Sequence, residues 1–346
     1  MTAWAPAQAA AGAPGAPAAR AALVLWPAPG LPPLPASADV EGGWRTLRRQ
    51  AGPALKAGDP LGAVAAALGV SAVALAAAHA GVFDPAESPL KARRLQPDAA
   101  ALWALAAPLL AGGRLQVGGG ALSLDTPARG PGLALLQPEG AAVAEVYALD
   151  RRLAGDAVQR HLVCFDAAGS PLLGLQPGPQ TAWAAFYAVV RRLGQPAPRH
   201  DSAAPAAGVP LRATVAGARL DPGAGWELLA RAAQGGLPLK LTVGNAAVSG
   251  SHTGAIDQLA LRGRWLCLRS AETELRLDEQ RLHGAWCQRH TGRQGLRHTL
   301  HLQMADGSWL TLADAAEAGR PETCAWRLLV QSLWPADQPG AAPCLR

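Results

Sequence analysis

Hydrophobic and polar residues alternate along four stretches of the chain between residues 255 and 290. They read AIDQLALRG, RWLCLRS, TELRLD and LHGAWCQRH. Alternation with a period of two is typical of a strand that buries one face. Polar or glycine turns separate the stretches, as they do between consecutive strands. The region is therefore predicted to form an antiparallel meander with one apolar face.

A long apolar run lies at residues 61–81. Its length approaches that of a membrane-spanning helix. Much of the run is alanine and glycine, however, and Ser71 follows Gly69 and Val70. A serine placed before a new apolar face is a typical helix N-cap. We therefore expect helices over 40–82, two of them short and joined by a turn at 68–71, and no transmembrane segment.

The rest of the chain carries one pattern twice. In each copy a helical stretch ends at a Gly-Gly pair, which is common at helix C-termini. A VGxxAxS segment, a strand–turn–strand hairpin and a closing helix then follow in the same order. Such an ordered series of matches indicates a duplicated α+β unit. The paired segments are 98–113 and 221–236, 117–123 and 243–249, 161–175 and 298–312, and 181–193 and 323–334.

These patterns predict an α+β fold with a tandem structural repeat, each copy having a large antiparallel β-sheet and flanking helices. The offset between matching tryptophans grows from 123 residues (Trp103 to Trp226) to 143 (Trp183 to Trp326), so insertions are expected in the second copy. The patterns leave open whether the two sheets stack or form one sheet, and a cleft between the copies is the expected place for a ligand. The predicted divisions are a disordered Ala/Pro-rich tail (1–38), N-terminal helices with the first repeat (39–197), a Pro/Ala linker (198–215), the second repeat (216–336) and a C-terminal tail (337–346).

Composition excludes some partners. Half of the 346 residues are apolar, which is enough for a sizeable core. The formal net charge is +6, but the basic residues are scattered and no run of five occurs. Aromatic residues do not interleave with basic ones as they do on single-strand nucleic-acid platforms. We therefore expect a solvated basic surface and no nucleic-acid partner.

The cysteines and the missing motifs indicate the compartment and exclude several enzyme classes. Five cysteines, with no Cys-x-x-Cys or Cys-x-x-His spacing, favour free thiols in a reducing compartment over structural zinc. The first residues lack an early Lys or Arg and are interrupted by proline, unlike a secretory signal. The chain contains no GxGxxG, GxxxxGK[ST], HExxH or GxSxG motif. These features predict a cytoplasmic protein without a standard catalytic motif.

Histidines gather in the second copy. Those at 298 and 301 have an odd separation, so they are expected on opposite faces of one strand. His252 lies between Gly250 and Gly254, in a small-residue segment that a ligand could approach closely. The sequence leaves open whether His252 binds a ligand or is an ordinary turn residue. The five histidines are His252, His283, His290, His298 and His301.

Short motifs run through the second copy in a fixed order: VGN, TG, GxWL, a strand, AW, RxT and DG. In this order they resemble the bacterial haem-utilisation proteins of the HemS/HmuS/ChuS kind. The hairpin HLVCFDAAGSPLLGL and the helical segment LGVSAVALAAAHAG resemble the first half of that family more weakly. The resemblance covers about residues 40–335. The motifs lie at 243–245, 253–254, 263–266, 275–277, 285–286, 289–291 and 306–307.

The resemblance implies two α+β repeats with large antiparallel sheets and a b-type haem bound in a cleft. Members of the family are cytoplasmic haem carriers, and a haem-uptake transporter is the protein partner that this role implies. Some members are haem-degrading enzymes that open the porphyrin with an electron donor and oxygen or peroxide. The resemblance leaves open whether this chain is an enzyme.

Two iron-facing motifs of the family are missing. The family ligates iron through a histidine in a motif like HQFF ahead of the second repeat. This chain has QPAPRHDSAAPAAGVP there, with His200 as its only histidine. The family's LDLRLF motif, whose arginine lies over the other haem face, has no clear match in 141–152, although Arg151 and Arg152 are close by. Arg289 matches the arginine of the family's RKPT motif, and His290 replaces its lysine.

The resemblance and its departures together predict a relocated iron ligand. His252 is the first candidate and His200 the second, because neutral imidazole is a usual haem ligand. Arg289 and His290 are expected to pair with the propionates. No catalytic residue is predicted. The favoured function is cytoplasmic haem binding for trafficking or utilisation, with haem held by the second repeat. The alternatives are a haem-degrading oxidoreductase and a non-enzymatic scaffold that has lost haem binding.

Overall fold

The structure is a computed structural model of the chain. Its described residues belong to one compact unit, Ser37–Arg346. The tails predicted at 1–38 and 337–346 and the linker predicted at 198–215 lie outside the described residues, so the predicted divisions stay predictions. The structure describes residues 40–82, 88–98, 101–102, 112–128, 143–155, 157–178, 183–195, 217–245, 247–292, 295–316 and 320–333.

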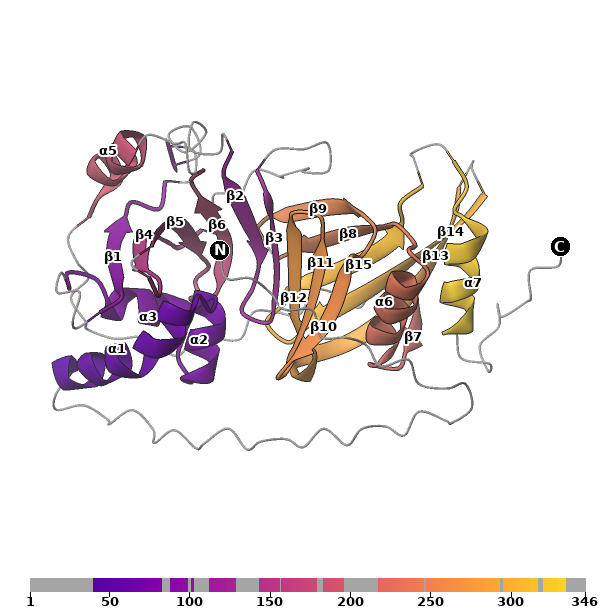
Figure 1. The fold of residues 1–346 in the computed structure, drawn as a ribbon, viewed down its shortest axis with the longest axis horizontal. Helices are drawn as coiled ribbons and strands as arrows, with labels where there is room; N and C mark the ends of the chain where they lie inside the picture. The colour runs from indigo at the N-terminus through magenta and orange to yellow at the C-terminus, as the bar shows by residue number, and fades with distance from the viewer. Residues whose placement is uncertain are drawn as a thin grey trace. The chain divides into compact units, whose positions relative to one another are not determined.

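Three helices precede the first strand (Figure 1). They are α1 (Val40–Ala57), α2 (Leu61–Ala67) and α3 (Ala72–Ala78). Ser71 Oγ accepts a hydrogen bond from the Ala74 N–H at 3.2 Å, which confirms the predicted cap and the two short helices. In the described part of the chain no single helix is long and apolar enough to cross a membrane. The pair α2 and α3 passes a test of length and composition, with a bend of 97° between them.

The larger sheet, sheet A, has nine antiparallel strands in the order β1-β4-β5-β6-β2-β3-β12-β11-β10. Six of them come from the first copy and three from the second. They are β1 (Leu90–Leu95), β2 (Arg114–Gly118), β3 (Leu122–Pro127), β4 (Glu145–Arg152), β5 (Val158–Phe165), β6 (Pro171–Gln176), β10 (Gln258–Arg262), β11 (Trp265–Ser270) and β12 (Thr273–Asp278).

The smaller sheet, sheet B, has six antiparallel strands in the order β7-β13-β14-β15-β8-β9. They are β7 (Ala218–Leu220), β8 (Leu239–Gly244), β9 (Ser249–Gly254), β13 (Leu282–Gly292), β14 (Gly295–Met304) and β15 (Trp309–Asp314). The remaining described helices are α5 (Trp183–Leu193), α6 (Ala224–Gln234), α7 (Cys324–Ser332) and the 3-10 turn η3 (Glu279–Arg281).

The two sheets repeat the same strand order. The series β1-β4-β5-β6-β2-β3 in sheet A corresponds to β7-β13-β14-β15-β8-β9 in sheet B. The predicted hairpins are β5–β6 and β14–β15, and their turn glycines, Gly169 and Gly307, have φ of +73° and +81°. Only glycine adopts such angles without strain. The tandem-repeat α+β fold predicted from the sequence is confirmed.

The predicted meander is divided between the two sheets. Strands β10–β12 follow β9 in the chain but pair in sheet A, where β12 lies against β3, while β13 returns to sheet B. Buried leucines match across this pairing: Leu275 faces Leu124, and Leu277 faces Leu122. Alternation predicts which side chains face inward but not which strand is the partner. The insertion expected in the second copy therefore completes the sheet of the first.

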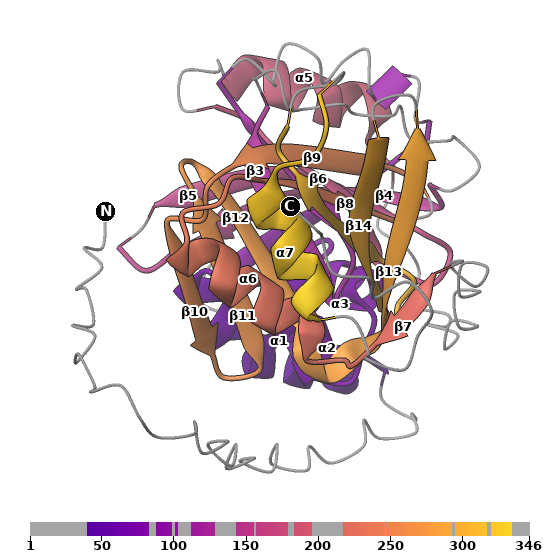
Figure 2. The same cartoon turned by 90° about the vertical axis from the view of Figure 1, so that its right-hand side faces the viewer.

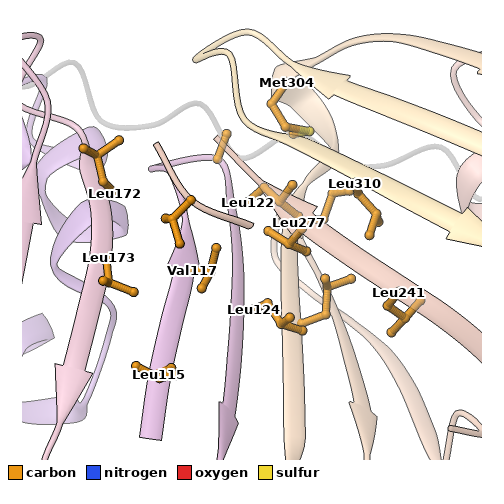
Figure 3. Close-up of a cluster of buried hydrophobic side chains, with 14 of the residues drawn as sticks. Leu115, Val117, Leu122, Leu124, Leu172, Leu173, Leu241, Leu277, Met304 and Leu310 are labelled. Carbon is orange, nitrogen blue, oxygen red and sulfur yellow. The ribbon is translucent and has the colours of Figure 1, made fainter. Parts of the chain in front are cut away.

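The sheets stack through the faces that carry their buried residues, which we call the core faces. Strands β2 and β3 lie against β8 and β9. A Cβ added at Gly250 would lie 3.2 Å from the Val117 side chain, so the two backbones approach closely. Leucines of both copies fill this contact, among them Leu124 and Leu241 (Figure 3). One hydrophobic core therefore spans both copies.

Helices cover the opposite, outer face of sheet A. Helices α1–α3 pack there, and Tyr147, Leu149 and Val163 are buried beneath them. Helices α6 and α7 contact each other (Figure 2) and pack on the core face of sheet B, where a Cβ at Gly225 would lie 2.8 Å from Leu302. The structure describes no helix packed on the outer face of sheet B.

Candidate functional site

His252 joins the two sheets. It lies on β9 directly opposite the buried Leu241, so its ring is on the core face of sheet B. Its Nε2 is 2.9 Å from Ser270 Oγ and its Nδ1 is 3.1 Å from Thr273 Oγ1, two hydroxyls of the β11–β12 hairpin. Burial lowers the pKa of His252, opposed by Asp257. The neutral ring therefore donates to one hydroxyl and accepts from the other.

The structure does not bring the predicted site residues together. Arg289 and His290 are neighbours on β13, so their side chains leave opposite faces, and both are exposed. Strands β14, β15 and β8 separate β13 from β9, which places His252 about 19 Å away at the usual strand spacing. His200 lies outside the described residues. The iron-ligating roles of His252 and His200, and the propionate roles of Arg289 and His290, stay predictions.

His298 and His301 lie on opposite faces of β14, as their spacing predicted. His298 is buried on the core face, where its Nδ1 is 2.8 Å from Glu322 Oε1. Arg327 Nε donates to the same carboxylate oxygen at 2.9 Å. These contacts with a buried carboxylate give His298 a structural role. His301 is half-buried on the outer face, and its Nδ1 is 3.2 Å from Thr311 Oγ1.

The outer face of sheet B forms a continuous surface in the described strands. Cross-strand pairing puts His301 between Trp286 of β13 and Thr311 of β15 in one row. The strand residues on this face include no carboxylate. Its members include Arg219, Trp286, Gln288, His290, Arg297, Thr299, His301, Gln303, Trp309, Thr311, Ala313, Lys240, Thr242, Ser249, Ser251 and Thr253, with Gly284 and Gly244.

Two indole rings lie over glycines on this face. A Cβ added at Gly284 would collide with the Trp286 ring, and one added at Gly244 would collide with the Trp309 ring. Both rings therefore lie low against the sheet, where a larger residue would displace them. The resulting surface combines flat aromatic groups, two histidines and several cationic side chains. Such a surface suits a planar, anionic ligand.

Two hollows lie beside sheet A, and among the described residues no histidine lines either. One, of about 430 Å³, is lined by residues of both copies, including Ser71, Arg281 and Asp306. The other, of about 670 Å³, is lined by Arg114, Asp125 and other polar residues. Within the described ranges no group of three or more His, Cys, Asp or Glu side chains could hold a metal ion. A porphyrin iron needs only axial protein ligands, so the outer face of sheet B remains the candidate site.

Sequence reasoning missed this face as a site because its members come from six strands. The one sequence signal was the odd spacing of the two histidines on β14, which placed one of them opposite the buried side. Trp286 and Trp309 gave no separate signal, since an isolated tryptophan in a strand is more often part of a core.

Comparison with known proteins finds a family model that matches most of the second copy. A protein-family model described as "Haemin-degrading HemS.ChuX domain" matches residues 205–333. This match confirms the resemblance that the sequence motifs predicted in the second copy. A comparison with curated proteins finds no match.

Two solved structures share the fold. One is holo-PhuS, a heme-binding protein from Pseudomonas aeruginosa, with a TM-score of 0.65 and 24% identity, covering 86% of this chain and 98% of its own. The other is the heme degrading enzyme ChuS of Escherichia coli O157:H7, with a TM-score of 0.65 and 18% identity, covering 84% of this chain and 100% of its own. These similarities show the tandem-repeat fold.

Proposed function

We propose that this protein, whose residues 205–333 match a family model described as a HemS.ChuX domain, binds b-type haem and carries it in the cytoplasm for trafficking or utilisation. The observation that carries the proposal is the outer face of sheet B within that domain. It presents two indole rings, two histidines and cationic side chains, and it has no carboxylate on its described strands. A haem-uptake transporter is the proposed source of the haem.

The residues of this face fit a haem. Trp286 and Trp309 supply flat apolar contact for the porphyrin. Arg297, His290 and Lys240 supply positive or hydrogen-bonding groups for propionates. The chain has no Cys-x-x-Cys pair for covalent attachment, which supports a non-covalent b-type haem. Bound haem would supply an iron centre, and the protein supplies the surface that orients it.

We rank the roles predicted for His252 and Arg289 below the proposed site on the outer face of sheet B. His252 would have to give up its bonds with Ser270 and Thr273 before it could ligate iron. Arg289 faces the core side of the sheet, on the strand pair that carries His298. His290 faces the outer side, which agrees with its predicted propionate role.

A haemin titration of the full chain tests the proposal. We expect a saturable Soret change at one haem per chain. The Trp286→Ala variant should bind haemin about fivefold more weakly, because one flat aromatic contact is lost. Trp226→Ala is the matched control, since this tryptophan is 37% exposed on α6, away from the outer face. Only weak, non-saturating changes in the wild type would favour the scaffold without haem.

Haem degradation is a second candidate function. The description of the matching family model favours it, as does the degrading activity stated for ChuS. Adding ascorbate and oxygen to the haem-loaded protein tests it. Loss of the Soret band with release of iron would assign the enzyme activity, and a stable band would assign a carrier.

A further inference from the structure

We infer that the hollow of about 430 Å³ between the two copies binds a small dianion with carboxylate or phosphate groups, through Arg264 and Arg281. We call this hollow the junction pocket. Its volume lies within the range of small-molecule sites in proteins. The described residues that line it include none from the outer face of sheet B, so the inference goes beyond the proposed haem function and does not rest on it.

The walls of the junction pocket are turns and helix ends from both copies. The first copy contributes the turn between α2 and α3, with Ser71, and the β5–β6 turn, with Ser170. The second copy contributes Arg264 from the β10–β11 turn, Arg281 from η3 and Asp306 from the β14–β15 turn. The two guanidinium groups of the pocket are therefore both carried by the second copy, and they face backbone turns of the first.

Hydrogen bonds hold these walls in place. The Val73 N–H donates to Gly169 O at 3.1 Å, which joins α3 to the β5–β6 turn. Asp306 Oδ2 accepts from the Ala121 N–H at 2.8 Å, and its Oδ1 accepts from the Ser308 N–H at 3.1 Å. A site whose walls are fixed in this way is formed before a ligand arrives, so binding costs little ordering.

Both guanidinium groups keep donors for a ligand. Arg264 forms an ion pair from Nε to Asp278 Oδ2 at 3.1 Å, and Arg281 Nη1 lies beside Gly120, where an added Cβ would be 3.8 Å away. Both arginines are half-buried, and among the described residues neither guanidinium donates a hydrogen bond to another protein group. A guanidinium carries five N–H donors in a planar fork that matches a carboxylate or a phosphate.

The neighbouring carboxylates leave Arg281 as the cation that a ligand can pair with. Asp278 is fully buried and pairs with Arg264, while the Asp306 carboxylate is used by the N–H groups of Ala121 and Ser308. No described carboxylate lies within ion-pair distance of Arg281. Because the two arginines and two aspartates balance in formal charge, a dianion would be held by short charge-assisted hydrogen bonds rather than by long-range attraction.

Isothermal titration calorimetry of the full chain tests the inference. Inorganic phosphate and succinate are the two probes, each used at constant ionic strength, and they separate a phosphate site from a dicarboxylate site. We expect saturable binding of at least one probe at one per chain. Arg281→Gln should weaken it about tenfold or more, because charge-assisted hydrogen bonds are lost. Arg49→Gln is the matched control, since it removes the same charge from an exposed position on α1.

Arg281→Lys provides a second test that keeps the charge. It should recover only part of the affinity, because an ammonium lacks the planar fork of a guanidinium. Circular dichroism checks that each variant is folded. Absence of saturable binding of both probes to the wild type would overturn the inference. Unchanged affinity in Arg281→Gln, or an equal loss in Arg49→Gln, would also overturn it.

Discussion

His252 shows, at the scale of a residue, how a distant strand decides what a side chain does. Its glycine-bounded segment allowed either a ligand or a turn residue. In the structure its ring instead bridges two sheets, through hydroxyls of Ser270 and Thr273 that are themselves almost fully buried. Spacing along the chain predicts the face of a strand, but a contact between two sheets depends on how they pack.

The burial of His79 leads us to expect that the protein loses stability in acid. It is fully buried at the end of α3, where its Nδ1 contacts Ser88 Oγ. Burial, and then the nearby Arg48, lower the pKa of His79 from 6.5 to about 4. The unfolded chain therefore takes up this proton at a higher pH than the folded chain. The stabilisation is present above pH 6.5 and is lost as the pH falls towards 4, by about 3 kcal/mol.

Urea unfolding at pH 7 and pH 4 measures this effect. The free energy of unfolding of His79→Gln should fall less between the two pH values than that of the wild type. The comparison cancels the contribution of the other titrating groups. An equal fall in both proteins would show that His79 does not cause the acid sensitivity.

At the scale of an element, two turns hold the copies together. Asn245, in the turn between β8 and β9, donates from Nδ2 to Gly118 O at 3.0 Å and to Leu172 O at 2.8 Å, both in the first copy. Asp306, in the β14–β15 turn, accepts a hydrogen bond from the Ala121 N–H at 2.8 Å. The VGN and DG motifs of the second copy therefore hydrogen-bond the second copy to the first.

Replacing Asn245 tests how much its hydrogen bonds to the first copy contribute to stability. Asn245→Ala removes the bonds across the copies and leaves two buried carbonyls without this donor, so the free energy of unfolding should fall by about 2–3 kcal/mol. Asn245→Asp removes the donor to the first copy. It keeps the side-chain oxygen that accepts hydrogen bonds from the N–H groups of Ala247 and Val248. Urea unfolding of the two variants separates these contributions. A fall in the free energy of unfolding of less than about 0.5 kcal/mol in Asn245→Ala would mean that these hydrogen bonds contribute little to stability.

The sequence predicted the elements better than their partners. Matches between the copies predicted both hairpins, and alternation predicted the strands between residues 255 and 290. Neither pattern predicted that β12 pairs with β3, because any strand with one buried face offers the same backbone groups. The candidate site had to be missed for the same reason, since Trp286, His301 and Trp309 become neighbours only when β13, β14 and β15 pair.

At the scale of the whole molecule, the copies share strands and a core. The chain crosses from sheet B to sheet A after β9 and returns after β12, so sheet A is built from both copies, whereas sheet B is built from the second copy alone. Buried side chains from both copies form one cluster. The two halves are thus expected to unfold together.

Unfolding of the full chain and of a fragment tests this coupling. The full chain should unfold in one transition, with circular dichroism and tryptophan fluorescence giving the same midpoint. A fragment of residues 205–333 should show no cooperative transition, because Leu275 and Leu277 of β12 lose their partners on β3. Two separate transitions in the full chain, or a cooperative fragment, would contradict the coupling.

The shared strands also affect the order of events during synthesis. Strand β3 leaves the ribosome long before β12, its partner in sheet A. At about 5–20 residues per second, the edge of β3 waits on the order of ten seconds for that partner. An unpaired strand edge is a template for pairing with other chains. The nascent first copy is therefore a natural client for chaperones, even though the finished protein pairs this edge completely along residues 122–125.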